Sequence, residues 1–363
     1  MAFDPRIRNL ARVLVRYCVS ASRGQCVGIS GGTESESLIV AVYEELLRCG
    51  AFPVIRMTPD AVMDSFYTLA REYHLKTLSP YERAFSRVVD STINILSSGN
   101  TKSLSGTVPR KQMRMARLMK PVWNTLRKKP WVLTLYPTRA YAQDAEMSLR
   151  EFEDFVFAAA FADRRDPIGA WRRLGKRQER LIAGLRGAGN IRIEAPDTDL
   201  NLSVKGRKFV NSDGHNNMPS GEIFAAPLES SAEGHITFDL PSCRYGREIA
   251  GVRLTFRKGA VVNASAEKNE KFLKTMLKTD RGAQRLGEIG IGTNYSINKC
   301  TRNILFDEKT GGTVHLALGK SPSGTGGRNS SAIHWDLIKD LRKGGSIKVD
   351  GRKFQRDGKF IRG

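Results

Sequence analysis

Long apolar runs are missing from this sequence of 363 residues. Its most apolar windows, residues 36–47 and 152–161, are interrupted by charge and fall short of the roughly 18 apolar residues that span a membrane. The first 20 residues also lack the apolar segment and cleavage site of a secretory signal, because arginines are spaced along them. We therefore expect a cytoplasmic protein that does not cross a membrane.

Cysteine is scarce, and its five residues are scattered along the chain without a C-x-x-C pair. Disulfide frameworks and zinc fingers need closely spaced cysteines, so the sequence excludes both. We expect reduced thiols that serve as small core residues. The five are Cys18, Cys26, Cys49, Cys243 and Cys300.

Acidic residues are few relative to basic ones. The 37 Asp and Glu stand against 59 Lys and Arg, which gives a formal net charge of +22 at pH 7. Such a positive field attracts polyanions, and nucleic acid is one candidate partner. The basic clusters recur at helical spacing, however, and no zinc finger or RNA-binding motif accompanies them, so a solvated helix face is the favoured interpretation. The clusters contain Arg110, Lys111, Arg114, Arg117, Arg127, Lys128, Lys129, Arg172, Arg173, Lys176 and Arg177.

Strand and helix patterns alternate in the first third of the chain. A short apolar run at 25–30, a glycine turn at 31–33, an amphipathic helix at 34–47 and a second apolar run at 52–57 predict a β-α-β unit and hence a parallel sheet. A strand-like segment at 87–96, a basic helix at 110–128 and a strand at 131–136 continue the alternation. We predict an α/β fold whose first domain, residues 1–189, is Rossmann-like. The glycine turn lacks a dinucleotide or phosphate-loop motif, so nucleotide binding is not favoured.

The pattern changes after two predicted helices at 147–162 and 167–185, which end at Gly187 to Gly189. Short strands with turn residues between them follow, at 191–194, 200–204, 236–238, 252–256 and 260–264. One helix is predicted at 268–278, and residues 321–331 form a glycine- and serine-rich loop. The second predicted domain, residues 190–363, is therefore mostly β, an α+β metal-binding domain.

Candidate metal ligands gather in this second domain. It holds four of the five histidines, and His334 and Asp336 are spaced so that both side chains of a strand point the same way. His315 follows the Asp307-Glu308 pair and lies in an apolar run, where a histidine buried in the core is the alternative. Glu222 and Glu288 occupy apolar or glycine-rich settings, where the alternative is a solvated turn acid. Together these acids and imidazoles suffice for two divalent ions. The four histidines are His215, His235, His315 and His334, and His74 stands apart.

The chain resembles the aminopeptidase T family of metallo-aminopeptidases, which includes the enzymes called PepS and AmpS. The matching words are Thr134-Leu135-Tyr136-Pro137, residues 142–149, residues 196–200, residues 211–214 and residues 217–222. The resemblance implies a homodimer that cleaves peptides with two divalent ions, zinc, cobalt or manganese. By position it assigns the ligands to Glu222, Glu288, Glu308, His315, His334 and Asp336. Two features depart from the family pattern: residues 320–327 hold no counterpart of its active-site tyrosine, and Glu308 lies farther from His315 than is usual.

This resemblance suggests a mechanism in which a metal-activated hydroxide attacks the carbonyl of the first peptide residue. Glu288 is the candidate bridging ligand, and Glu308 is either a ligand or the general base. The alternative is a non-haem Fe(II) dioxygenase that opens dihydroxypyridine rings with a His/His/Asp set. Such a set needs a second histidine beside His334 and Asp336, whereas the chain offers Glu222 and Glu288, so the hydrolase is favoured.

Overall fold

The computed structural model describes residues 4–107, 109–244 and 246–361. By internal contacts the chain forms two compact units. The first contains the residues up to Ala170 together with Gly214–Pro219, and the second contains Trp171–Asp213 and the residues from Ser220 on. The division falls within the first turn of the helix Pro167–Gly184, between Ala170 and Trp171, whereas the predicted boundary at 189/190 lies after that helix. Within the described residues, no helix is long and apolar enough to cross a membrane.

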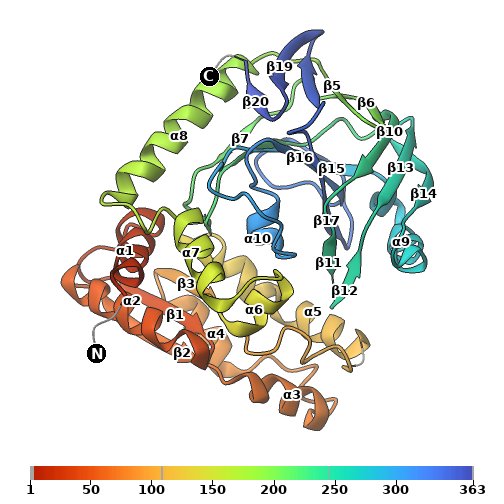
Figure 1. Cartoon of the computed structure of the whole chain (residues 1–363). Coiled ribbons are helices and arrows are strands. Elements are labelled where there is room, and N and C mark those ends of the chain that lie inside the picture. Colours follow the sequence, from red (N-terminus) through yellow and green to blue (C-terminus); the bar gives the residue numbers. More distant parts are fainter. Residues whose placement is uncertain (1–3, 108, 245, 362–363) are drawn as a thin grey trace. The chain divides into compact units, whose positions relative to one another are not determined.

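The first unit is built on a parallel sheet with the strand order β2-β1-β3-β4-β8 (Figure 1). The parallel pairing confirms the β-α-β unit predicted from the alternation of apolar runs. The strands are β1 (Cys26–Gly31), β2 (Phe52–Met57), β3 (Ser91–Leu96), β4 (Trp131–Leu135) and β8 (Asn217–Met218).

Helices and helical turns connect these strands. They are α1 (Pro5–Val13), η1 (Leu14–Cys18), η2 (Thr33–Ser35), α2 (Glu36–Arg48), α3 (Asp60–Leu69), α4 (Pro80–Val88), α5 (Pro109–Leu126), α6 (Arg139–Asp144) and α7 (Leu149–Ala159). The crossovers from β1 to β2 and from β3 to β4 run in opposite directions across the sheet. Right-handed crossovers therefore place α2 and α5 on opposite faces.

One predicted strand of this unit is too long. Residues 87–96 were expected to be extended, but α4 runs to Val88 and β3 begins only at Ser91. The helix starts at Pro80, and the side chain of Ser79 caps it by accepting a hydrogen bond from the backbone N–H of Tyr81. These start signals fix a helix through a segment whose apolar residues alone resemble a strand.

The second unit is mostly β, as predicted. Helix α8 (Pro167–Gly184), which lies in this unit from Trp171 on, precedes the sheets. An eight-stranded sheet has the order β14-β13-β10-β6-β5-β18-β19-β20, and a five-stranded antiparallel sheet has the order β17-β16-β15-β9-β7. This arrangement of one parallel and two large antiparallel sheets is that of the predicted α/β class.

The larger sheet is composed of β5 (Asn190–Ala195), β6 (Thr198–Ser203), β10 (Glu233–Phe238), β13 (Val252–Arg257), β14 (Ala260–Ser265), β18 (Ser346–Val349), β19 (Arg352–Arg356) and β20 (Lys359–Phe360). The smaller one is composed of β7 (Val210–Ser212), β9 (Glu222–Ala225), β15 (Leu286–Gly292), β16 (Thr313–Gly319) and β17 (His334–Asp340). A ribbon of β11 (Ser242–Arg244) and β12 (Arg247–Ile249), helices α9 (Glu270–Leu277) and α10 (Ile304–Asp307) and the turn η3 (Arg281–Gln284) complete the unit.

One apolar core joins the two large sheets of the second unit. Ile191 and Leu200 enter it from the eight-stranded sheet, and Ile289 and Leu316 enter it from the five-stranded sheet. The five-stranded sheet therefore has one face fixed in a hydrophobic core.

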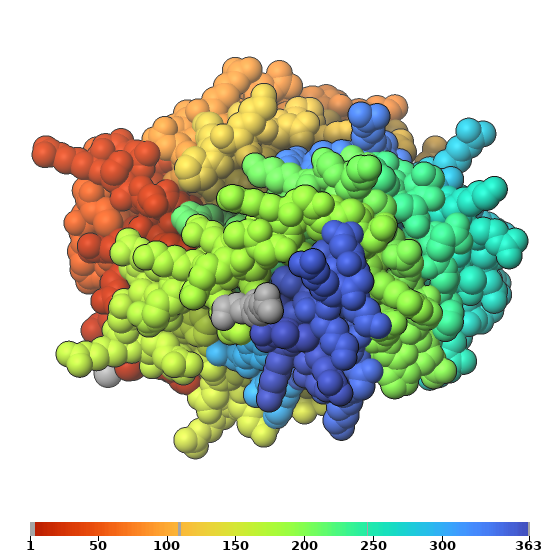
Figure 2. All heavy atoms as spheres, turned by 90° about the horizontal axis from the view of Figure 1, so that it is seen from above, coloured from red at the N-terminus to blue at the C-terminus, as the bar shows by residue number. Residues whose placement is uncertain are grey.

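The C-terminal strands, blue in Figure 2, lie on the surface beside α8, where the guanidinium of Arg177 is 5.8 Å from the centroid of the Phe360 ring.

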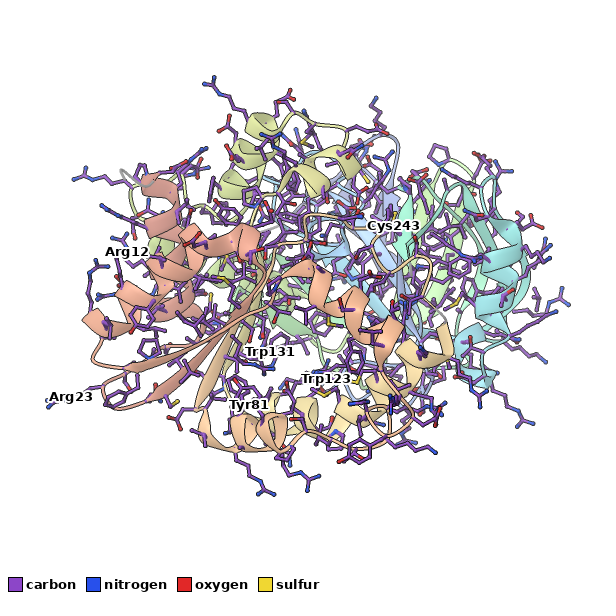
Figure 3. The ribbon with its side chains drawn as sticks, turned by 90° about the horizontal axis from the view of Figure 1, so that it is seen from below. Arg12, Arg23, Tyr81, Trp123, Trp131 and Cys243 are labelled. Atoms are coloured by element: carbon purple, nitrogen blue, oxygen red, sulfur yellow. The ribbon has the colours of Figure 1, made fainter. Side chains whose placement is uncertain are left out.

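The cysteine prediction holds only in part. None of the five cysteines forms a disulfide bond, as expected, but only Cys18 is buried. Cys26, Cys49, Cys243 and Cys300 are partly exposed, so the prediction that they are core residues was wrong. Cys243 lies in the short β11 ribbon and is labelled in Figure 3. Strand ends and helix ends leave small side chains accessible even where the surrounding segment is apolar.

Candidate metal centre

Five of the six predicted ligands lie on four neighbouring strands of the five-stranded sheet. Glu222 begins β9, Glu288 lies in β15, His315 lies in β16, and His334 and Asp336 lie in β17. The sixth, Glu308, follows directly after α10. Antiparallel pairing thus brings together side chains that are separated by up to 114 positions in the sequence.

The pairing register places the five strand residues on one face of the sheet. Glu288 pairs with Ala317, and Ala317 pairs with Asp336 on the next strand. Because residues directly opposite each other point to the same side, these two acids flank the small side chain of Ala317. The alternate residues of the same strands, such as Ile289 and Leu316, enter the apolar core. One face is therefore polar and the other hydrophobic.

Gly290 makes room for an imidazole on the polar face. It pairs directly with His315, and a Cβ atom added to Gly290 would lie 2.1 Å from both Cε1 and Nε2 of that ring. The ring therefore lies flat over the strand at this position. Any side chain larger than hydrogen would displace it.

Glu288 lies between the two histidines. Its Oε1 is 3.5 Å from Nε2 of His315, and its Oε2 is 3.3 Å from Nε2 of His334. On the far side of each histidine stands another carboxylate: Glu222 Oε2 is 3.3 Å from His315 Nε2, and Asp336 Oδ1 is 3.4 Å from His334 Nε2. Acids and imidazoles thus alternate along the site.

Three overlapping sets of these side chains could each hold a cation, with ligand atoms within 4.8 Å of one another. They are Glu222/Glu288/His315, Glu288/His334/Asp336 and Glu308/His315/Asp336. Two of the sets share Glu288, which offers a different oxygen to each histidine. Mixed nitrogen and carboxylate ligands suit zinc, cobalt and manganese.

Buried polar atoms without hydrogen bonds support this fit. His315 is fully buried, yet neither of its ring nitrogens forms a hydrogen bond of acceptable geometry with a described residue. Oε2 of Glu222 is also buried without a hydrogen-bond partner among the described residues. Buried polar groups are normally satisfied, and a bound cation would satisfy Oε2 of Glu222 and Nε2 of His315, which lie 3.3 Å apart.

The electrostatics of the site reflect four acids gathered in a buried space. Burial opposes a charged imidazole, but the carboxylates of Glu288 and Glu222 outweigh it and raise the pKa of His315 to about 9. Burial likewise opposes charge on His334, and Asp336 outweighs it and raises the pKa of His334 to about 10. The reciprocal effect of His334 lowers the pKa of Asp336 despite burial. The site attracts positive charge strongly.

The three glutamates respond in the opposite direction. Burial raises the pKa of Glu222, Glu288 and Glu308, and neighbouring cationic groups only partly offset it. Carboxylates of this kind are costly to keep ionised without a bound cation or an ion pair. The environment of these glutamates therefore favours the binding of a cation.

Contacts outside the cluster hold the ligands in place. Nδ1 of His334 is 2.7 Å from the carbonyl oxygen of Lys320, which leaves Nε2 to face Glu288 and Asp336. The fully buried amide of Gln178 in α8 donates from Nε2 to the carbonyl oxygen of Glu222 at 2.8 Å. Such contacts around a metal site commonly set the orientation of its ligands.

Lys309 was not predicted and is the main addition to the site. Its side chain is fully buried, its Nζ contacts Oε1 of Glu308, and the same nitrogen is 3.6 Å from Oε1 of Glu222. Its position directly after the predicted ligand Glu308 is the only signal that the sequence offers. The ammonium group supplies a fixed positive charge on one side of the cluster.

The other histidines do not join the site. His215 belongs to the first unit, where its ring centroid is 4.6 Å from that of Tyr17, and His235 lies in β10 of the eight-stranded sheet. His74 follows α3 in the first unit. Of the four histidines in the second half of the chain, only His315 and His334 therefore lie among the candidate ligands.

Comparison with known proteins identifies the family. The model of the thermophilic metalloprotease (M29) family matches residues 3–360. The chain belongs to this family. Membership in the thermophilic metalloprotease family confirms the resemblance found in the sequence and the prediction of a metal-dependent hydrolase.

Curated relatives of this chain are named aminopeptidases. Aminopeptidase T of Thermus thermophilus is 27% identical over 93% of this chain and 93% of its own length. Aminopeptidase 2 of Geobacillus stearothermophilus is 25% identical over 88% of this chain and 84% of its own length, and aminopeptidase AmpS of Bacillus subtilis is 24% identical over 97% of each. The solved structure of AmpT from Thermus thermophilus matches with a TM-score of 0.85 at 24% identity, covering 99% of this chain and 100% of its own, and so shares its fold.

Proposed function

We propose that this metalloprotease is an aminopeptidase that releases N-terminal residues from peptides with two divalent ions. The observation that carries the proposal is the position of Glu288, whose two oxygens face two different histidines at 3.5 and 3.3 Å. A carboxylate in that position is suited to bridge two ions, one with Glu222 and His315 and the other with His334 and Asp336. The names of the curated relatives support a peptide substrate.

Divalent ions at these positions would polarise the scissile carbonyl and lower the pKa of an attacking water. Glu308 is the acid best placed to accept the proton of that water. Its side chain is 14% exposed, against 6% for Glu222 and 8% for Glu288, so it is the most accessible of the three glutamates. The contact with the ammonium group of Lys309 orients the Glu308 carboxylate.

The dioxygenase alternative has less support. An open-sided iron site needs both histidines and one carboxylate around a single ion. In the described part of the chain, no set of ligand atoms within 4.8 Å combines His315 and His334, and each histidine is instead grouped with acids. The metalloprotease family match points the same way.

A homodimer, which the family resemblance suggests, and a cytoplasmic location, which is expected from the sequence, are also part of the proposal. Sedimentation of the purified full chain would give the mass of one or two copies of the 40.3 kDa polypeptide. Cell fractionation with an antibody against the chain would test the compartment.

The test of the catalytic proposal combines metal content and hydrolysis of leucine p-nitroanilide. We expect the wild type to bind two ions per chain and to cleave the anilide, and we expect Glu288→Gln to lose at least about a hundredfold in turnover. Glu179→Gln serves as the matched control, because Glu179 is exposed on α8. Normal turnover and metal content in Glu288→Gln would disprove the bridging role.

A further inference from the structure

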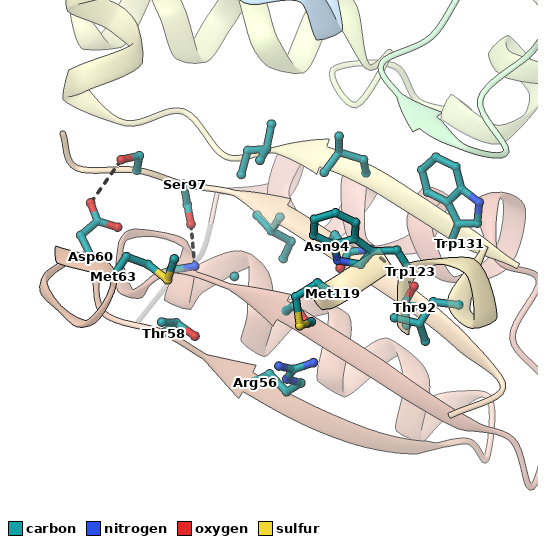
Figure 4. A pocket seen from close by; sticks show the side chains of 18 of the residues that line it. Arg56, Thr58, Asp60, Met63, Thr92, Asn94, Ser97, Met119, Trp123 and Trp131 are labelled. Atoms are coloured by element: carbon teal, nitrogen blue, oxygen red, sulfur yellow. Dashed lines mark hydrogen bonds between the residues drawn. The ribbon is translucent and has the colours of Figure 1, made fainter. Parts of the chain in front are cut away.

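The first compact unit holds a cavity of about 880 Å³ that the proposed peptidase function does not use. It lies against the face of the parallel sheet that α4 and α5 cover, and the loops that follow β2 and β3 border it (Figure 4). All of its lining residues belong to this one unit. A volume of this size is typical of small-molecule sites.

The floor of the cavity is polar where a buried parallel sheet is normally apolar. On one face of the sheet, Val27, Ile29 and Ile93 are fully buried. On the other face, Ser30 pairs with Asn94, and both line the cavity. Parallel strands covered on both faces usually read as continuous hydrophobic runs, so this alternation is unusual.

The polar residues form a row across the sheet. Arg56 of β2 pairs with Ser30 of β1, Ser30 pairs with Asn94 of β3, and Asn94 pairs with Leu133 of β4. Paired residues of neighbouring parallel strands point to the same side, and all four line the cavity. Three polar side chains from three strands therefore converge on one hollow.

Two acceptor atoms in the lining have no hydrogen-bond donor among the described residues. Nδ2 of Asn94 donates two long hydrogen bonds of 3.4 Å, to Oγ1 of Thr92 and to the carbonyl oxygen of Val132. Oδ1 of Asn94 accepts no hydrogen bond from a described residue. Glu82 pairs with Arg56 through Oε1, whereas its Oε2 is buried without a partner. Oδ1 of Asn94 would accept a hydrogen bond from a ligand that carries N–H groups.

The walls are aromatic and thioether side chains. Figures 3 and 4 both place Trp123 of α5 next to Trp131 of β4, and Met63 and Met119 line the same space. Trp123 is 41% exposed, which leaves one side of the ring free for contact. Flat indole faces and polarisable sulfur atoms favour a planar aromatic ligand.

The polar end of the cavity is not suited to phosphate. The backbone N–H of Gly32 donates to Oγ of Ser97 at 2.8 Å, and the backbone N–H of Gly99 donates to Oδ2 of Asp60 at 2.6 Å. These N–H groups at the carboxyl ends of β1 and β3 are the ones that would hold a phosphate in a nucleotide-binding fold. The carboxylate of Asp60 adds negative charge at the same place.

We propose that this cavity binds a planar, N–H-bearing heteroaromatic molecule of the nucleobase type that carries no phosphate. The ring edge donates to Oδ1 of Asn94, and the ring faces contact Trp123 and the methionines. None of the lining residues belongs to the second unit, which holds all six candidate metal ligands.

Isothermal titration of the full-length protein with adenine and uracil tests the proposal. We expect one site per chain with a dissociation constant below about 1 mM for at least one of the two bases. Toluene, which is flat but has no hydrogen-bonding edge, should bind at least about tenfold more weakly. Inorganic phosphate alone should not bind. The phosphate group of AMP should add no affinity, so AMP should bind no more tightly than adenine.

Variants locate the binding. Asn94→Ala and Trp123→Ala should each weaken base binding at least about tenfold. Tyr73→Ala is the matched aromatic control, because Tyr73 is 69% exposed and does not line the cavity, and it should bind as the wild type does. Asn94→Asp, which keeps an acceptor oxygen, reports on the site if the alanine variant does not fold.

Three results would overturn the proposal. They are the failure of both bases to bind at about 1 mM, equal affinity of the wild type and Trp123→Ala, and toluene binding as tightly as the bases. Each leaves the peptidase proposal untouched, since metal content and anilide hydrolysis are measured separately.

Discussion

At the scale of single residues, the candidate metal centre depends on size as much as on charge. Glu288, Gly290 and Gly292 share one face of β15, and only the first contributes a ligand. Gly290 leaves space for the His315 ring, and a Cβ on Gly292 would lie 1.9 Å from the carbonyl oxygen of Thr310. Because Gly290 and Gly292 have no side chains, the His315 ring and the Thr310 carbonyl group can pack over the strand.

Gly290→Ala is predicted to weaken metal binding by about ten- to a hundredfold, because the added methyl group displaces the imidazole of His315. Overpacking should also lower the free energy of unfolding by about 1–3 kcal/mol. Titration with Zn²⁺ followed by metal analysis measures the first effect, and urea unfolding measures the second. Gly184→Ala, where a Cβ meets no atom within 4 Å, is the control that should leave metal affinity unchanged.

At the scale of elements, α8 anchors the strand that begins with Glu222. The Nε2 atom of Gln178 donates to the carbonyl oxygens of Glu222 and Ser212 and to Oγ1 of Thr293, at 2.8, 3.1 and 3.1 Å. One buried amide therefore connects the helix to β7, β9 and the end of β15.

Gln178→Leu should lower the free energy of unfolding by about 1–3 kcal/mol, because the variant leaves buried carbonyl oxygens without a donor. The loss of the contact to Glu222 should also weaken Zn²⁺ binding by about tenfold. Glu179→Leu changes the adjacent exposed position and should alter neither quantity. Wild-type metal affinity in Gln178→Leu would show that β9 keeps its position without the helix.

Asp280 connects η3 to the segment that leads into β17. Its carboxylate accepts hydrogen bonds from Oγ of Ser331 at 2.8 Å and from the backbone N–H groups of Ala283 and Ala332 at 2.9 and 2.8 Å. Although burial opposes ionisation, these donors lower the pKa of Asp280 below its usual value of 3.8. The ionised form therefore stabilises the folded state.

Asp280→Asn is predicted to lower stability in a pH-dependent way. The difference from the wild type, about 1–3 kcal/mol, should be fully present at neutral pH and at pH 5, above the unfolded pKa. It should shrink as the pH falls below 3.8 and through the lower folded pKa, because the wild-type carboxylate is then protonated. Urea midpoints of both proteins across this range check the trend, and a constant difference down to pH 3 would contradict it.

The elements also show what the sequence could predict. The parallel sheet follows from short apolar runs separated by an amphipathic helix, and these local patterns survive folding. The strands β15 and β16 are buried on both faces, and β15 is also rich in glycine, so no alternation of exposed and buried residues marks them. The six candidate ligands could be named from residue type and family resemblance, but the shared face depends on antiparallel register, which is set by distant pairings. Lys309 was missed for the same reason.

At the scale of the whole molecule, some of the basic side chains that make up the positive charge form hydrogen bonds and ion pairs within the fold. Within the first unit, the Nζ atom of Lys111 in α5 donates to the carbonyl oxygen of Tyr67 at 2.6 Å, and Arg114 pairs with Glu72. Lys129 donates to the carbonyl oxygen of Arg87 at 3.0 Å. Several members of the basic clusters are thus structural, which favours the solvated-helix interpretation over a nucleic-acid interface.

Metal removal should act on one unit alone, because all six candidate ligands lie in the second. Dialysis against EDTA is expected to lower the thermal midpoint, since an ion at about a thousand times its dissociation constant contributes about 4 kcal/mol. Hydrogen exchange should quicken in β15, β16 and β17 and stay unchanged in β1 and β3. Restoring Zn²⁺ should reverse the effect, and uniform loss of protection in both units would contradict the separation.

The two-faced character of β15 and β16 has a consequence for assembly during folding. Ile289 and Leu316 fill the core, while Glu288 and His315 lie one position away in the chain and point outward from it. Mispairing these strands by one residue would push acids into hydrocarbon and expose isoleucine and leucine instead. Only the native alignment places the candidate ligands on one face, so a bound cation would stabilise correctly paired chains over misaligned ones.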